Sequence, residues 1–109
     1  MKNNIQYKLK MMIQGLKEMY SKHLIDIADP EDKNLLFIKI ELTKGLTEAK
    51  ISLFNALTNA IIVKTYPMAK LLKECSNIFT VNEMVKRDCK IMYQKSKATI
   101  YDSNITISI

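Results

Sequence analysis

The sequence predicts an all-α protein, a small bundle of about four helices built on a long central helix. Glycine and proline number only two each in 109 residues, which leaves little room for the turns of an all-β fold. One glycine and no further proline lie between Pro30 and Pro67. Within that segment apolar residues recur at intervals of three and four, apart from one gap of seven, so they fall on one face of a helix. These residues are Leu35, Leu42, Leu46, Ala49, Leu53, Ala56, Ala60 and Val63.

The first helix is expected from about Asn4 to Ile27. Lysines lie between its apolar residues and occupy mainly the solvated side. Gly15 lies inside the pattern at a cost of roughly 1 kcal/mol relative to alanine, and it would allow a close helix crossing. The apolar stripe consists of Ile5, Leu9, Met12, Leu16, Met19, Tyr20, Leu24 and Ile27.

The segment Ala28–Asp32 predicts a tight junction between the first and second helices. Asp29 suits the N-cap of the second helix, and Pro30 suits its first position. Glu31 and Asp32 then lie at the positive end of the helix dipole. A junction this short predicts that the two helices fold back as an antiparallel hairpin.

The second, central helix is expected to run to about Thr65. Its second half, Ile51–Val63, is apolar around most of its circumference, which a helix tolerates only when it is enclosed. Either the later helices or a second subunit would enclose it. Three small residues on one line, Ala49, Ala56 and Ala60, would let a partner helix approach closely.

A strand is the alternative for part of this segment. Residues Ile38–Leu42 alternate strictly between apolar and charged side chains, and Lys44-Gly45 would then form a turn. The expected cap at Asp29 and the unbroken apolar spacing downstream favour the helix.

Two shorter helices and a tail complete the predicted bundle. Pro67 ends the second helix, and the third runs from there to about Ser76. Thr80 is expected to begin the fourth helix in a capping box with Glu83. Residues 102–109 are expected to form an edge strand, a partner-binding strand or a disordered end.

Composition predicts a single helical domain, residues 1–109, in the cytoplasm. The net charge is +6, and Arg87 is the only arginine, so the basic excess fits an AT-rich coding sequence better than selection for nucleic acid. The longest uncharged run, Ile51–Val63, is too short and too polar to span a bilayer, and no signal peptide is evident. Cys75 and Cys89 are expected to be buried, reduced thiols.

No catalytic, cofactor or metal site is predicted, and no small-molecule substrate is evident. His23 is the only histidine, and with Cys75 and Cys89 it supplies too few ligands for a zinc site. A Cys–His nucleophile pair would lack an orienting third residue and an oxyanion site. A glycine-rich phosphate loop is excluded because Gly15 and Gly45 are the only glycines. We therefore expect a protein that is not an enzyme.

The sequence favours a non-catalytic protein-binding module of the adaptor, chaperone or inhibitor type. Its partner would be another protein or a second copy of itself, because the central helix has more apolar surface than a chain of 109 residues is expected to cover. The expected partner-binding residues are Ala49, Leu53, Ala56, Leu57, Ala60 and Ile61.

The alternative is a small DNA- or RNA-binding regulator that uses the basic fourth helix. Phosphate contacts need little more than exposed basic side chains interleaved with aromatic residues, here Tyr93 and Tyr101. The expected nucleic-acid-binding residues are Lys86, Arg87, Lys90, Lys95 and Lys97.

Overall fold

The computed structural model describes residues 3–74, 77–98 and 105–109. It shows a mixed α/β fold, in which a four-stranded sheet packs against helices. The predicted all-α bundle is therefore wrong, because the segment expected as one long central helix forms three strands. In chain order the elements are α1 (Asn3–Ile27), the 3₁₀ turn η1 (Lys33–Leu35), β1 (Leu36–Leu42), the 3₁₀ turn η2 (Lys44–Leu46), β2 (Glu48–Asn55), β3 (Ala60–Pro67), α2 (Met68–Glu74), α3 (Ile78–Ala98) and β4 (Ile105–Ser108).

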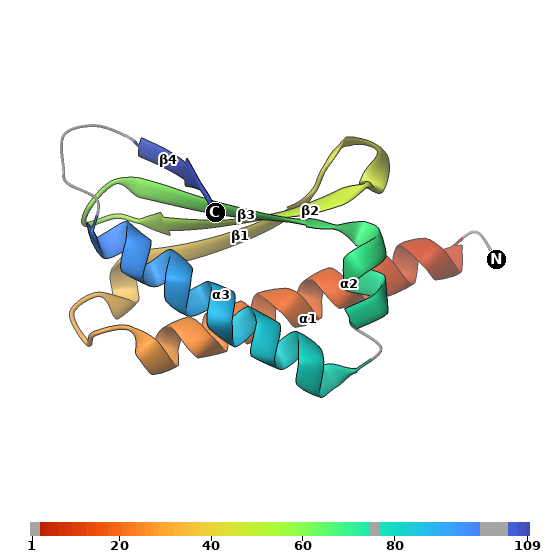
Figure 1. Ribbon diagram of the computed structural model, residues 1–109, viewed down its shortest axis with the longest axis horizontal. Helices are drawn as coiled ribbons and strands as arrows, with labels where there is room; N and C mark the ends of the chain where they lie inside the picture. The colour runs from red at the N-terminus through yellow and green to blue at the C-terminus, as the bar shows by residue number, and fades with distance from the viewer. Residues whose placement is uncertain (1–2, 75–76, 99–104) are drawn as a thin grey trace.

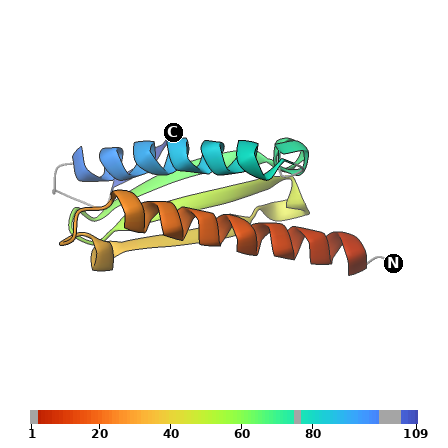
Figure 2. The same ribbon diagram turned by 90° about the horizontal axis from the view of Figure 1, so that it is seen from below.

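The sheet has the strand order β1-β2-β3-β4. The first three strands are antiparallel, and β4 adds parallel to β3 after the connection through α2 and α3. Figure 1 shows α1 and α3 on the same face of the sheet, and Figure 2 shows them side by side and running in the same direction. The predicted antiparallel hairpin of the first two helices is therefore wrong, since α1 packs against α3 and β1.

Strand β1 follows the alternation of apolar and charged residues in the sequence. Its even-numbered residues are half-buried against the core, and its odd-numbered residues are exposed. The strand alternative for Ile38–Leu42 is confirmed. Gly45 lies in the turn to β2 with a φ of +79°, a conformation that glycine adopts without steric cost.

The apolar run Ile51–Val63 forms the two central strands and their turn. A continuous apolar run is typical of a buried strand as well as of an enclosed helix, and β-branched residues favour the strand. The turn is built by polar residues: the Asn55 side chain accepts a hydrogen bond from the backbone N–H of Leu57 at 3.0 Å. Asn59 adopts a φ of +61°, which asparagine tolerates better than most residues. The helix expected to continue to Thr65 is therefore absent.

Helix α1 confirms the predicted first helix, but the predicted helix cap at Asp29 is wrong. The N–H of Asp32 bonds to the carbonyl of Asp29 at 2.8 Å, so the chain turns after α1. The N–H of Leu35 then bonds to the carbonyl of Asp32 at 2.8 Å, and η1 leads directly into β1. The side chains of Asp29 and Asp32 bond to α3 instead of capping a helix.

Helices α2 and α3 occupy the places of the predicted third and fourth helices, but the predicted cap of the fourth is wrong. Helix α3 begins at Ile78, and the Asn77 side chain accepts hydrogen bonds from the N–H groups of Phe79 and Thr80 at 3.1 and 3.3 Å. Asn77, rather than Thr80, is therefore the capping residue. Strand β4 includes part of the predicted tail, and residues 102–104 lie outside the described residues.

The core lies between the sheet and the α1–α3 layer. Each part contributes buried side chains, such as Tyr20 from α1, Leu53 from β2, Ile62 from β3 and Val85 from α3. No helix within the described ranges has an apolar stretch of the length needed to cross a bilayer. The side of the sheet that faces α1 and α3 therefore forms part of the core.

Candidate protein-binding surface

The side of the sheet that faces away from α1 and α3, here called the outer face, is not covered by any described helix (Figure 1). Because side chains alternate along a strand, every second residue points to this side. The pairing register brings Phe37, Phe54, Ile61 and Thr106 into one row across the four strands. The outer face comprises Phe37, Lys39, Glu41, Glu48, Lys50, Ser52, Phe54, Ile61, Val63, Thr65, Pro67, Thr106 and Ser108.

The apolar part of the outer face is the row Phe37–Phe54–Ile61. The rings of Phe37 and Phe54 stack with their centroids 6.2 Å apart and their planes at 28°. Phe37 is nevertheless 55% exposed, and Phe54 and Ile61 are half-buried. Removing a side chain such as that of Phe37 from water is worth about 1.5–3 kcal/mol. A stacked aromatic pair in which one ring remains exposed is a feature of contact surfaces.

The outer face carries no net charge, in contrast to the helices. Its charged residues are two lysines and two glutamates, and Lys39 Nζ lies 3.7 Å from Glu41 Oε2. The register also sets Glu41 opposite Lys50. The three helices hold eleven basic and five acidic residues, whereas the rest of the chain holds six of each. The net charge of +6 is therefore located on the three helices α1, α2 and α3.

The six residues predicted to bind a partner do not form one surface. Three are buried in the core, two lie in the β2–β3 turn, and only Ile61 lies on the outer face. They were expected on one helix face, but a strand directs neighbouring residues to opposite sides. The buried three are Ala49, Leu53 and Ala60, and the two in the turn are Ala56 and Leu57.

The basic residues predicted to bind nucleic acid are exposed along α3, and Lys97 and Arg87 contact acidic side chains. Lys97 Nζ pairs with the Asp29 carboxylate and lies 3.8 Å from Asp32 Oδ2. Arg87 Nε lies 3.3 Å from Asp88 Oδ1. Lys86, Lys90 and Lys95 are exposed on the same helix.

A buried polar network joins α1, β3 and α3. The hydroxyls of Tyr20 and Tyr66 lie 2.7 Å apart, and the Tyr66 hydroxyl donates to Asp88 Oδ2. Burial is the main cause that raises the pKa of both tyrosines above the ordinary value of 10.0. All three side chains are at most 3% exposed, so a substrate could not reach them. The network holds elements together.

A second network fastens the loop after α1 to the last turns of α3. The Tyr93 hydroxyl donates to Asp32 Oδ2 at 2.6 Å and accepts from the N–H of Asp29 at 3.0 Å. The hydrogen bond with Lys97 lowers the pKa of Asp29 and raises the pKa of Lys97. Desolvation, and then the bond to Asp32, raise the pKa of Tyr93. Tyr93 is thus part of the scaffold, and Tyr101 lies outside the described residues.

The histidine and cysteine considered for chemistry both pack between α1 and α3. His23 Nε2 lies 3.0 Å from Asn82 Oδ1. Cys89 Sγ donates to the carbonyl of Tyr20 at 3.7 Å, and burial raises the pKa of this thiol to about 12. Cys75 lies outside the described residues. In the parts of the chain that the structure describes, no three His, Cys, Asp or Glu side chains gather as metal ligands would.

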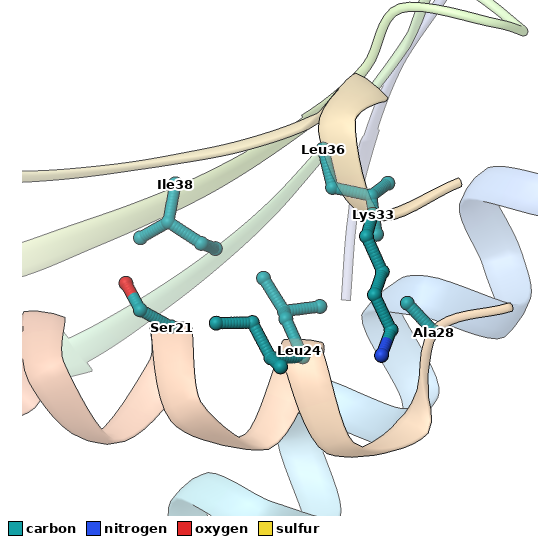
Figure 3. Close-up of a pocket in the computed structure, with 7 residues that line it drawn as sticks. Ser21, Leu24, Ala28, Lys33, Leu36 and Ile38 are labelled. Atoms are coloured by element: carbon teal, nitrogen blue, oxygen red, sulfur yellow. The ribbon is translucent and has the colours of Figure 1, made fainter. Parts of the chain in front are cut away.

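Two hollows lie between α1 and β1, at the edge of the sheet. The first has a volume of about 160 Å³, and Figure 3 shows Ser21 and Leu24 of α1, with Ala28 just after this helix, across from Leu36 and Ile38 of β1. The second, toward the other end of β1, has a volume of about 410 Å³. It is lined by Leu9, Lys10, Ile13, Gln14, Leu42 and Leu46.

Comparison of the chain with protein-family models, with curated proteins and with solved structures gives no significant match. Phe37 and Phe54 were not among the residues that the sequence predicted for a binding surface. The alternation around Ile38–Leu42 is the signal that could have found Phe37, whereas the stacking of Phe54 beside it follows only from the register.

Proposed function

We propose that this protein is a non-catalytic protein-binding module, of the adaptor, chaperone or inhibitor type, whose outer face binds another protein. The observation that carries the proposal is the uncovered row Phe37–Phe54–Ile61 on a face without net charge. Protein interfaces are depleted of charge at their centre and enriched in aromatic residues. The partner is expected to present an apolar, uncharged centre, with polar groups where it meets Lys39 and Lys50.

The non-catalytic part of the proposal is supported by how the reactive side chains are used. Tyr20, Tyr66 and Asp88 hydrogen-bond to one another inside the protein. The raised pKa of Cys89 keeps its thiol protonated, and a thiol is a weaker nucleophile than a thiolate. These groups serve the scaffold, which leaves the outer face as the surface for recognition.

We also propose that the protein acts in the cytoplasm. A buried thiol such as that of Cys89, which hydrogen-bonds to a backbone carbonyl, is suited to a reducing compartment.

DNA or RNA binding through α3 is the second candidate. It is supported by the location of the net positive charge on the helices and by the exposure of Lys86 and Lys90, one helical turn apart. The contacts of Lys97 and Arg87 with acidic residues weaken it, because these cations are already partly neutralised. We therefore favour protein binding over binding of DNA or RNA.

The test is affinity purification of the tagged protein from cells that express it, followed by quantitative mass spectrometry. The variant Phe54→Thr/Ile61→Thr removes the apolar row from the two central strands while it keeps residues that favour strands. We expect the recovered amount of a specific partner to fall by roughly tenfold or more, because two interface anchors typically contribute more than about 1 kcal/mol each to binding. Thermal unfolding of the variant checks that the fold is retained.

The matched control is Phe79→Thr, which removes an aromatic side chain that is 71% exposed on α3. It should leave partner recovery unchanged. Equal loss with the control, or full recovery with the double variant, would contradict the proposal. Salt-sensitive binding of a labelled oligonucleotide, lost on Lys86→Gln/Lys90→Gln, would favour the second candidate instead.

A further inference from the structure

We infer that two copies of this chain join edge to edge through β1, antiparallel about a two-fold axis at Ile40, so that their sheets become continuous. This inference concerns the edge of the sheet and a second copy of the chain. It therefore does not depend on the proposal that another protein binds the outer face.

Strand β1 is an end strand with one side of its backbone available for pairing. The N–H of Thr43 donates to the carbonyl of Glu48, and the N–H of Ala56 donates to the carbonyl of Leu35. The N–H and C=O groups of the odd-numbered residues in and beside β1 therefore point to β2. In an antiparallel ladder these groups alternate in direction. The N–H and C=O groups of even-numbered residues therefore point away from the sheet. They belong to Leu36, Ile38, Ile40 and Leu42.

The charges on β1 specify one register for a second copy. When Ile40 pairs with Ile40 of the second copy, Ile38 pairs with Leu42 of that copy, and all these residues use their outward backbone groups. Lys39 then lies opposite Glu41 of the second copy, and the two-fold axis repeats this pair. Lys39 and Glu41 of the second copy then share no backbone hydrogen bond. In an antiparallel ladder, side chains lie closer in pairs of this kind than in hydrogen-bonded pairs. The exposed side chains of Lys39 and Glu41 in one copy are thus complementary in charge to the same two side chains in the second copy.

The neighbouring registers are unfavourable for the same reason. A shift of the second copy's strand by two residues in one direction places Lys39 opposite Lys39 of that copy. The same shift in the other direction places Glu41 opposite Glu41 of that copy. Like charges directly opposite each other destabilise a strand pair. Charged residues on an edge strand usually discourage pairing altogether, but here they permit one pairing and oppose its neighbours.

The two hollows beside β1 match the same register. Ile38 lines the first hollow, and Leu42 lines the second. Since Ile38 lies opposite Leu42 of the second copy, a leucine side chain is placed at the first hollow and an isoleucine at the second. Both residues are half-buried in the single chain, and pairing would remove more of their apolar surface from water. Ile25, which is 57% exposed and also lines the first hollow, lies on the same side.

The experiment is to measure the molar mass of the full chain by sedimentation equilibrium over a range of concentrations. We expect a dimer. The single changes Lys39→Glu and Glu41→Lys each place like charges opposite each other twice, so each should weaken dimerisation by roughly tenfold or more. The double change Lys39→Glu/Glu41→Lys restores opposite charges and should return the dissociation constant to near the wild-type value.

Hydrogen exchange provides a second measurement on the unmodified protein. The amides of Ile38, Ile40 and Leu42 should become protected as the concentration rises, because they donate only across the proposed interface. Circular dichroism of each charge variant checks that the fold is retained.

The control for edge pairing is Thr106→Glu, which adds charge to the other end strand, β4, and should leave the dimer intact. Phe54→Thr/Ile61→Thr should also leave it intact, so failure of the proposed function and failure of this inference are distinguishable. A monomer at all concentrations would overturn the inference. So would a dimer that Thr106→Glu disrupts and Lys39→Glu does not, or a double charge swap that fails to restore dimerisation.

Discussion

The hydroxyl group of Tyr66 is the point where three elements meet. From β3 it contacts Tyr20 on α1 and donates to Asp88 on α3. Asp88 is 3% exposed, and its other oxygen accepts from Arg87 Nε at 3.3 Å. A buried carboxylate that loses a donor keeps its desolvation cost without the compensating bond. The two tyrosine hydroxyls are therefore not equivalent, because only that of Tyr66 donates to the acid.

We expect Tyr66→Phe to lower the free energy of unfolding by about 1–3 kcal/mol, and Tyr20→Phe by about 0.5–1.5 kcal/mol. The first change leaves Asp88 with fewer donors, whereas the second removes only the contact between the hydroxyls. Urea unfolding of the two variants measures both values. An equal loss in the two variants would show that the bond to Asp88 contributes little.

At the scale of the elements, the β2–β3 turn decides how the apolar run Ile51–Val63 folds. The turn depends on Asn55, whose side chain bonds to the backbone two residues on, and on Asn59, whose φ is +61°. Thr58 ties the turn to α3, because its hydroxyl donates to the carbonyl of Ser96 at 2.9 Å. Polar residues thus divide one long apolar run into two strands.

Replacement of Asn59 tests this role of the turn. Asn59→Ala should destabilise the protein by about 1 kcal/mol, because alanine adopts a positive φ less readily than asparagine. Asn59→Gly should leave the stability unchanged to within about 0.5 kcal/mol, because glycine accepts that φ freely. Thermal unfolding measures both changes. The control is Leu57→Ala in the same turn, a residue 56% exposed, which should have little effect. Equal stability of the two Asn59 variants would contradict the role given to φ.

The sequence predicted α1 because the long amphipathic pattern from about Asn4 to Ile27 is a strong local signal. The sequence did not predict the three antiparallel strands, because the spacing of three and four along residues 35–63 arose by chance over β1, β2, the start of β3 and the turns between them. Periodicity alone cannot separate a buried strand from an enclosed helix. The outer face could not be predicted either, because Phe37 and Phe54 become neighbours only through the register.

At the scale of the whole molecule, several buried acids couple stability to alkaline pH. Burial raises the pKa of Tyr20, Tyr66 and Cys89, the last to about 12. The unfolded chain therefore releases these protons at lower pH than the folded protein does. Stability from these groups is fully present below the ordinary thiol and phenol values of 9.0 and 10.0, and it is lost as the pH rises through and above them.

We expect the free energy of unfolding to fall between about pH 8 and about pH 11. Urea unfolding at these two pH values measures the change. The decrease in the free energy of unfolding between the two pH values should be smaller in Cys89→Ala and in Tyr20→Phe, since each variant removes one of the buried acids. A free energy of unfolding that is constant over this range would contradict the raised pKa values.

The parallel pairing of β4 has a consequence for how the protein is made. Residues 105–108 of β4 pair with residues 60–63 of β3, and α2 and α3 are synthesised between them. During translation, β1, β2 and β3 can assemble as a meander while the far side of β3 still lacks its neighbour. The nascent sheet thus has two open edges until β4 is synthesised, and translation itself determines when the second one closes.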